Sequence, residues 1–103
     1  MNEPLPYSLS NRAIKQLKKI RKTDRILYEK MVGGIDAICH DPDLGEPKKG
    51  DLKGYSSLDI SHMRTNYELC YKIEVNEKGD LVVIVMMGPR ENFWDDVKRY
   101  VQL

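Results

Sequence analysis

The feature that most constrains the fold is an unbroken run of seven apolar residues, Leu81 to Met87, which stops at Gly88-Pro89. An apolar run of this length, rich in valine and isoleucine, suits a strand that is buried on both faces of a sheet. The residues after it have helical spacing, with one apolar face made of Phe93, Val97, Tyr100 and Val101. We therefore predict a central strand that leads into an amphipathic helix, with Arg90 at the junction.

The length and composition favour one small domain over residues 1–103 with a single core. The chain has 103 residues, of which 41% are hydrophobic and 32% charged. No apolar run approaches the ~20 residues that a membrane-spanning helix needs. The first residues, Met-Asn-Glu-Pro, lack the pattern of a secretory signal, so we expect a cytoplasmic protein that has no membrane partner.

The first 55 residues predict an edge strand, two helices and a long loop. Leu5–Leu9 is short, apolar and broken by a proline, as edge strands often are. Ser10 is the expected cap of a helix that runs to about residue 21, and Thr23 the expected cap of a second helix that Pro42 ends. Two glycines within the second helix, at 33 and 34, indicate close packing or a bend. Residues 40–55 hold three glycines and two prolines and form the predicted loop.

The second half predicts consecutive antiparallel strands. A strand through Leu58 and Ile60 and a turn near Arg64 lead to residues 67–75, where apolar and polar residues alternate strictly. Residues 76–79 are a hairpin turn into the buried strand. The order β-α-α-β-β-β-α predicts an α+β fold, an antiparallel four-stranded sheet with its helices packed on one face and the polar face of the 67–75 strand left open.

The charge is unevenly distributed, although the formal net charge is only +1. Residues 1–35 hold eight Lys and Arg against three Asp and Glu, or +5, and residues 36–103 hold nine against thirteen, or −4. The basic residues of the first helix and its surroundings are Arg12, Lys15, Lys18, Lys19, Arg21, Lys22 and Arg25. Such a cluster either binds nucleic acid or an acidic partner, or is simply a solvated helix face.

The cysteines and histidines predict neither a disulfide nor a metal site. Cys39 and Cys70 fall on different elements of a chain expected in the cytoplasm, where thiols stay reduced. With only His40 and His62 and no paired cysteine motif, a zinc site is not expected, and we expect no cofactor.

Three motifs in this order resemble the RelE/ParE toxins of bacterial type II toxin–antitoxin modules. Leu52-Lys53-Gly54 before a polar strand is similar to the Leu-x-Gly approach of that family to its second strand. The stretch from Asn66 to Tyr71, Asn-Tyr-Glu-Leu-Cys-Tyr, resembles its Gly-Tyr-Arg-Leu-Val-Tyr strand. Gly88-Pro89-Arg90-Glu91 resembles its Gly-x-Arg-Glu ending. The resemblance extends over nearly the whole chain in the order of elements.

This resemblance implies a compact toxin that a cognate antitoxin protein neutralises. RelE-type members enter the ribosome and cut mRNA, whereas ParE-type members poison DNA gyrase. The nucleases use the ribose 2′-OH as the nucleophile on the adjacent phosphate, without a metal. That reaction needs a base for the proton, cations for the developing charge and an acid for the leaving oxygen.

The resemblance makes Arg90 the candidate phosphate contact, because it matches the arginine that follows the last strand in the family. Other family positions have lost their usual residue: Glu68 stands where nucleases have an arginine, Asp59 and Ser61 where lysines are common, and Asp96 where many have a tyrosine. Glu68 is then either a general base or a surface carboxylate paired with Lys72.

His62 and Arg64, near a strand end, are candidates to replace the missing catalytic groups. The unperturbed pKa of a histidine, about 6.5, suits a general base. Strict alternation from Leu58 and Ile60, however, points both side chains inward unless a bulge re-aims them.

The remaining candidates are RNA-binding residues. Lys48, Lys49 and Lys53 in the long loop suit phosphate contacts, although lysines there also serve solubility. Trp94 on the last helix is either partly buried core or a surface for base stacking or antitoxin contact. Arg90 itself is either a phosphate ligand or the partner of a plain salt bridge with Glu91 or Asp95.

The sequence therefore predicts a ribosome-dependent mRNA endoribonuclease toxin, with mRNA, the ribosome and an antitoxin as partners. The loss of cations at Asp59, Glu68 and Asp96 leaves open a non-nuclease toxin that binds gyrase or another protein. It also leaves open a small domain that has drifted from any toxin role.

Overall fold

The computed structural model describes residues 3–102; Met1 and Asn2, which open the N-terminal stretch discussed above, and Leu103 lie outside this range. The elements follow in the order β1 (Tyr7–Leu9), α1 (Asn11–Thr23), α2 (Arg25–His40), β2 (Glu46–Pro47), a 3₁₀ turn (Gly50–Leu52), β3 (Tyr55–His62), β4 (Thr65–Asn76), β5 (Gly79–Pro89) and α3 (Phe93–Val101).

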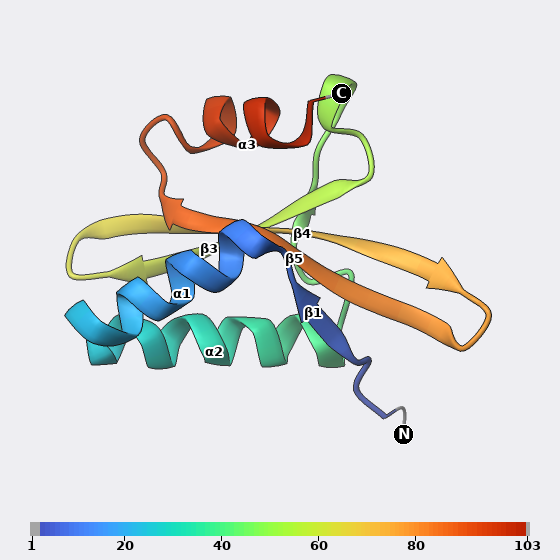
Figure 1. Ribbon diagram of the computed structural model, residues 1–103, viewed down its shortest axis with the longest axis horizontal. Helices are drawn as coiled ribbons and strands as arrows, with labels where there is room; N and C mark the ends of the chain where they lie inside the picture. The colour runs from blue at the N-terminus through green and yellow to red at the C-terminus, as the bar shows by residue number, and fades with distance from the viewer. Residues whose placement is uncertain (1–2, 103) are drawn as a thin grey trace.

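The mixed α+β class is as predicted, but the predicted four-stranded antiparallel sheet is wrong in detail. The sheet has five strands in the order β1-β5-β4-β3-β2 (Figure 1). Strand β1 runs parallel to β5, and the other neighbours are antiparallel. The extra strand, β2, is only two residues long, and a segment this short has no periodicity that a sequence pattern can reveal.

The helices cover both faces of the sheet, so the prediction that they pack on one face is also wrong (Figure 1). Helices α1 and α2 lie on one face over a core that includes Leu69, Tyr71 and Ile84. Helix α3 lies on the other face, where Phe93 and Val97 pack with Cys70, Val85 and Met86. Strand β5 is therefore buried on both faces, as its apolar run predicts.

A bulge in β5 allows this two-sided packing. Cys70 pairs with Met86 and Tyr71 with Ile84, so Val85 is an extra residue on β5. Such a bulge lets two successive side chains share one face. Val85 and Met86 both join the core under α3, whereas Met87 returns to the core under α1 and α2.

The two long helices meet at Asp24, one residue later than the predicted cap at Thr23. The carboxylate of Asp24 accepts a hydrogen bond from the Leu27 backbone N–H at 3.1 Å and so caps α2, while its own N–H donates to Ile20 at the end of α1. Ser10 caps α1 as predicted, accepting from Ala13 at 3.0 Å.

Glycine at position 34 lets α2 lie directly on the sheet. A Cβ there would come within 2.9 Å of the Ile60 side chain and 3.0 Å of Leu69, so a larger residue would force these side chains or the helix to shift. The predicted close packing at the glycine pair is therefore confirmed at Gly34, while a Cβ on Gly33 would meet nothing within 4 Å.

The long segment between α2 and β3 is held by the buried hydroxyl of Tyr71. This hydroxyl donates to the Pro42 carbonyl at 2.7 Å and accepts from the Gly45 N–H at 2.9 Å. The Lys48 N–H donates to the Tyr55 carbonyl at 2.8 Å. These bonds fix the loop against the sheet and set the place of the Lys48 side chain.

Candidate functional site

One polar hollow, of about 480 Å³, collects several of the predicted site residues. It lies on the sheet face that carries α3, and its walls come from the long loop, β3, β4, the end of β5 and the start of α3. The lining residues are Leu44, Glu46, Lys48, Ser57, Leu58, Asp59, Glu68, Arg90 and Trp94.

Arg90 bridges two carboxylates in this hollow. Asp59 and Glu68 are directly opposite each other on β3 and β4. The Nε of Arg90 donates to Glu68 Oε2 at 2.9 Å, and its Nη2 donates to Asp59 Oδ2 at 2.9 Å. Like charges placed opposite in a sheet repel each other, and the guanidinium offsets that repulsion.

Glu68 combines burial with two opposing charged neighbours. Its side chain is only 5% exposed, whereas those of Arg90 and Asp59 are 52% and 59% exposed. Burial raises the pKa of the Glu68 carboxyl, the hydrogen bond from Arg90 lowers it, and the neighbouring Asp59 raises it, with a net upward shift. The pKa of Arg90 is raised in turn, chiefly by its hydrogen bond with Glu68. A carboxyl whose pKa is raised by burial is a stronger base, once ionised, than an ordinary surface carboxylate.

Lys48 and Trp94 also line the hollow and contact each other. The Lys48 Nζ lies 4.4 Å from the centre of the Trp94 ring, within the range of a cation–π contact. Trp94 also meets Phe93 edge-on, with ring centres 5.0 Å apart. The ring is half-buried, so it is both a core contact and a wall of the site.

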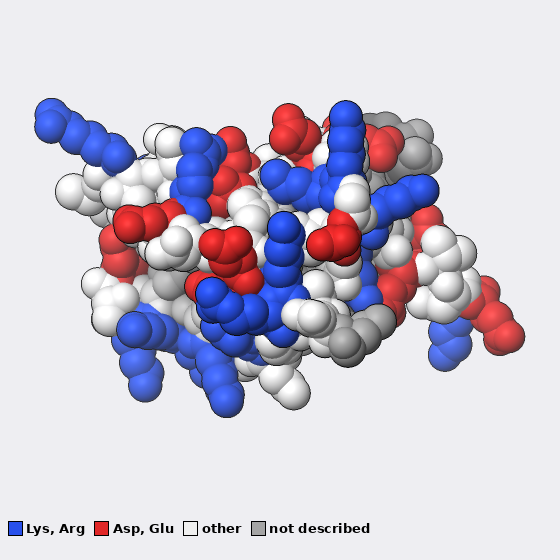
Figure 2. All heavy atoms as spheres, turned by 90° about the horizontal axis from the view of Figure 1, so that it is seen from above, with Lys and Arg blue, Asp and Glu red and all other residues white. Residues whose placement is uncertain are grey.

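The hollow contains three carboxylates, of Glu46, Asp59 and Glu68, against two cations, Lys48 and Arg90. On the side of the molecule that Figure 2 shows, basic and acidic side chains intermingle. The helices do not cover Arg90, but its Nε and its Nη2 both donate to carboxylates. The site therefore resembles a balanced charge network more than a strongly cationic groove.

The other predicted residues lie outside this hollow. His62 is buried on the opposite face of the sheet, where its Nε2 lies 2.8 Å from Asp24 Oδ2. Its inward orientation agrees with the strict alternation of β3. Arg64 is exposed and lies in the β3–β4 turn rather than on a strand, because the turn is Met63-Arg64 and not the predicted Arg64-Thr65-Asn66. Lys49 and Lys53 are exposed on the loop.

The partners of Arg90 differ from those that the sequence predicts. Glu91 and Asp95 were the expected salt-bridge partners, but the carboxylates that bind Arg90 belong to Asp59 and Glu68. Placing the turn at Met63-Arg64 makes Asp59 the cross-strand neighbour of Glu68. A turn placed correctly in the sequence would therefore have predicted that these two carboxylates lie side by side. Asp96 instead pairs with Arg99 at 2.8 Å.

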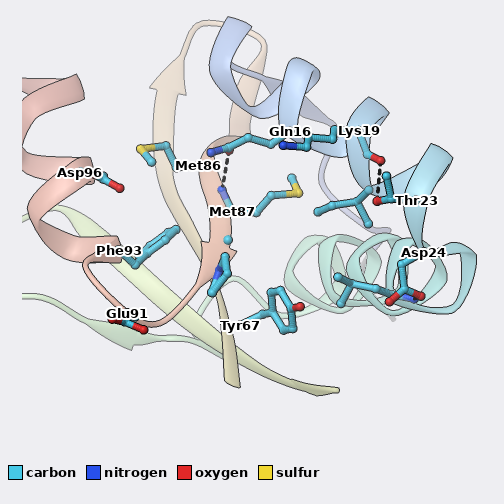
Figure 3. A pocket seen from close by; sticks show the side chains of 14 residues that line it. Gln16, Lys19, Thr23, Asp24, Tyr67, Met86, Met87, Glu91, Phe93 and Asp96 are labelled. Carbon is cyan, nitrogen blue, oxygen red and sulfur yellow. Dashed lines mark hydrogen bonds between the residues drawn. The ribbon is translucent and has the colours of Figure 1, made fainter. Parts of the chain in front are cut away.

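A larger cavity, of about 510 Å³, lies between α1, the start of α2, the end of β5 and the start of α3 (Figure 3). Gln16 reaches across it to accept a hydrogen bond from the Met87 N–H at 2.9 Å, where β5 extends beyond its pairing with β1. The cavity is lined by Asp24, Tyr67, Glu91 and Asp96 among others, and it contains none of the predicted catalytic residues.

Two further observations concern residues 3–102, the part of the chain that the structure describes. Nowhere in that range do three or more His, Cys, Asp or Glu side chains gather as potential metal ligands. None of the helices in it has the length and apolar character needed to cross a bilayer.

Comparison with known proteins assigns the family. Residues 8–98 match the family model described as the ParE-like toxin of type II bacterial toxin–antitoxin systems. The match extends over most of the chain, which therefore belongs to this family of toxins. The resemblance to RelE/ParE toxins that the three motifs indicated is confirmed, and an antitoxin is the expected partner of a member of such a system. No curated protein sequence matches the chain.

Several solved structures are similar to this chain in fold. The YoeB/ParE toxin from Agrobacterium tumefaciens is similar with a TM-score of 0.71 and 21% identity, over 84% of this chain and 99% of that one. The RelBE2 toxin–antitoxin complex from Mycobacterium tuberculosis contains a chain that is similar with a TM-score of 0.65 and 24% identity, over 85% of this chain and 100% of that one. A mutant of the E. coli toxin RelE in the free state is similar with a TM-score of 0.69 and 15% identity, over 95% of this chain and 94% of that one. At these identities the similarity concerns the fold.

Proposed function

We propose that this toxin is a ribosome-dependent mRNA endoribonuclease that acts in the cytoplasm through attack of a ribose 2′-OH on the adjacent phosphate. The observation that carries the proposal is the placement of Glu68, buried and with a raised pKa, 2.9 Å from the Arg90 guanidinium in an open hollow. Titratable groups shifted by burial and by a specific partner are typical of catalytic sites.

Each step of the reaction has a suitable group in the hollow. Glu68 is the candidate base that takes the proton from the 2′-OH. The guanidinium of Arg90, half-exposed beside it, stabilises the charge that develops on the phosphate oxygens. The Lys48 ammonium, which also lines the hollow, is the candidate acid that gives a proton to the leaving 5′-oxygen. Trp94 offers an apolar wall for a base.

The charge balance of the hollow supports dependence on the ribosome. With three carboxylates and two cations the hollow by itself attracts a polyanion poorly, so the substrate needs contacts outside the hollow. The seven basic residues of α1 and its surroundings, Arg12 to Arg25, are all exposed and lie outside the hollow. They offer a surface for ribosomal RNA.

The first experiment compares Glu68→Gln with the wild-type toxin. Purified protein is incubated with ribosomes and mRNA, and cuts are mapped by primer extension. Glutamine keeps the size of the side chain and an acceptor for Arg90 but removes the base, so we expect cleavage to fall by about 10²–10⁴-fold. Glu74→Gln, which removes the same charge from an exposed position on β4, is the matched control and should cut at the wild-type rate. Cleavage by Glu68→Gln at the wild-type rate would reject Glu68 as the base.

A second candidate is a toxin without nuclease chemistry that binds a protein target such as gyrase. The excess of carboxylates in the hollow favours it, because such a site suits a basic protein surface better than RNA. Growth arrest with intact mRNA and with gyrase-linked DNA breaks would support this candidate over the first.

A further inference from the structure

The tip of the β3–β4 hairpin has an unusual backbone. Its loop has two residues, Met63 and Arg64, between the paired His62 and Thr65. Their φ angles are +47° and +66°. Positive φ at both positions belongs to the type I′ hairpin loop, which strongly favours Asn-Gly. In this chain a methionine and an arginine adopt it instead, and such strain concentrates at functional sites.

Packing does not explain the choice of these two residues. The Met63 side chain is 81% exposed, and Arg64 is exposed as well. Neither residue therefore gains burial in return for its left-handed backbone. The other described non-glycine residue with positive φ, Asn92, follows Arg90 closely in the chain. Asparagine tolerates this backbone, so the strain is concentrated at the hairpin tip.

Contacts with the helix pair α1 and α2 hold the strand end next to the tip in place. His62 is 4% exposed, and its Nε2 bonds to Asp24 at the junction of α1 and α2. The Lys30 ammonium donates to the Ser61 carbonyl at 3.2 Å. These contacts fix the strand end that carries Met63 and Arg64. His62 is therefore a positioning residue for the tip, on the face away from the hollow.

The tip and the end of β5 enclose a second, shallow hollow of about 400 Å³. It is lined by Arg64, Thr65, Asn66, Pro89, Arg90 and Glu91. The Arg90 N–H donates to the Asn66 carbonyl at 2.9 Å and joins the two walls. Arg90 thus borders both this hollow and the site described above.

The free positive charge of this shallow hollow is that of Arg64. Arg90 is paired with Asp59 and Glu68, whereas Arg64 has no ion-pair partner among residues 3–102. Two arginines, Thr65 and Asn66 line this hollow, against one acidic residue, Glu91. This donor-rich set suits a phosphodiester, which arginine binds through its planar fork.

We propose that the shallow hollow between the β3–β4 tip and the end of β5 binds a backbone phosphate of single-stranded RNA next to the site of cleavage, with Arg64 as its main ligand. The inference rests on the proposed function, since it names how the substrate strand is held. The strand then passes from the hollow of Glu68 across Arg90 to Arg64.

The first test measures binding of a fluorescent 2′-O-methyl oligoribonucleotide, which cannot be cut because its nucleophile is blocked. Anisotropy is recorded at several salt concentrations. We expect Arg64→Ala to weaken binding several-fold and to reduce the slope of log K against log salt by about 0.7, the value for one phosphate contact on a single strand. Lys78→Ala is the matched control, because Lys78 is an exposed cation on the opposite hairpin, β4–β5, at the other end of the sheet (Figure 1). Equal slopes for the two variants would overturn the inference.

The second test separates binding from folding. In Arg64→Gly the left-handed position is occupied by the residue that favours it, so we expect the Tm to rise by about 4–8 °C. The same variant should lose binding as Arg64→Ala does. A change that stabilises the protein and weakens RNA binding is the signature of a strained binding residue. Retained binding in Arg64→Gly would contradict the proposal.

The ribosome assay distinguishes failure of the inference from failure of the proposed function. If the wild type cuts mRNA and the Arg64 variants bind and cut like it, the inference fails and the nuclease proposal stands. If the wild type does not cut mRNA but binds the oligonucleotide through Arg64, the nuclease proposal fails and the phosphate site stands.

Discussion

The guanidinium of Arg90 lies between two carboxylates that would otherwise repel each other across the sheet. Its role in the fold and its proposed role in chemistry therefore cannot be separated by removing Arg90 alone. An Arg90→Ala variant leaves Glu68 buried beside Asp59 without a partner, and such a variant loses stability for that reason alone. Substitution of Glu68 is the cleaner experiment, because glutamine is neutral and nearly the same size.

The stability of the protein should depend on pH through Glu68. Its pKa is raised in the folded state above the ordinary value of 4.5, so the folded state holds this proton to higher pH than the unfolded state. As the pH rises from about 4.5 through the raised folded-state pKa, the unfolding free energy of the wild type falls relative to that of Glu68→Gln. Below pH 4.5 the difference in unfolding free energy between the two proteins is constant. Urea unfolding of both proteins between pH 4 and 8 measures the effect, with Glu74→Gln as the control. A difference that does not change with pH would contradict the burial argument.

At the scale of elements, Asp24 joins α1, α2 and the end of β3. Its carboxylate caps α2 through the Leu27 N–H and also contacts the buried His62. The pKa of this carboxyl is lowered, first by the hydrogen bond from Leu27 and then by that from His62. One side chain therefore links the helix pair to the strand end that carries the strained tip.

Asp24→Asn is expected to destabilise the protein in a pH-dependent way. Asparagine still caps a helix but lacks the charge beside His62. Because the folded-state pKa of Asp24 is depressed, its contribution is present above the unfolded value of 3.8 and is lost as the pH falls through the lower folded-state value. Thermal unfolding between pH 2 and 7 should show a difference in Tm between the wild type and Asp24→Asn that becomes smaller as the pH falls. Asp36→Asn, exposed on α2, is the control; a gap as large for that variant would point to a general charge effect.

At the scale of the whole molecule, the sheet separates two cores. Cys39 belongs to the core under α1 and α2, and Cys70 to the core under α3; both are free and buried. Burial raises the pKa of the Cys70 thiol to about 12 and also raises that of Cys39. Neither thiol should react quickly in the native protein. The two cysteines therefore report separately on the two faces of the sheet.

Phe93→Ala should loosen α3 and expose Cys70 before Cys39. Phe93 is 3% exposed at the start of α3, and its loss should cost about 3–5 kcal/mol of unfolding free energy. Labelling with a thiol reagent, followed by mass spectrometry, should show a larger increase in rate at Cys70 than at Cys39. Tyr100 is 39% exposed and so does not share the buried face that the helical spacing predicted for it, and Tyr100→Ala should leave both rates close to wild type. Equal acceleration at both cysteines would mean that the two cores unfold together.

Much of the fold is already present in local patterns of the sequence. The apolar run of β5, the alternation of β4, the caps and the helical spacing each depend on neighbours in the chain, and they predicted the α+β class and nearly every element. The motifs around Arg90 and Tyr67 also indicated the toxin family. The burial of His62 followed from the alternation of β3, because a strand repeats every two residues.

Only the tertiary structure decided what surrounds Arg90 and where the last helix lies. When the position of a turn changes, every residue pair between the two strands changes with it. A turn at Arg64-Thr65-Asn66 does not pair Asp59 with Glu68, so the contacts of Arg90 with these two carboxylates could not be predicted. Likewise the bulge at Val85 and the turn after Pro89 place α3 on the far face of the sheet, and local periodicity carries no information about which face a helix covers. The sequence determined the elements and the family, and the pairing of distant strands decided the charge network of the site.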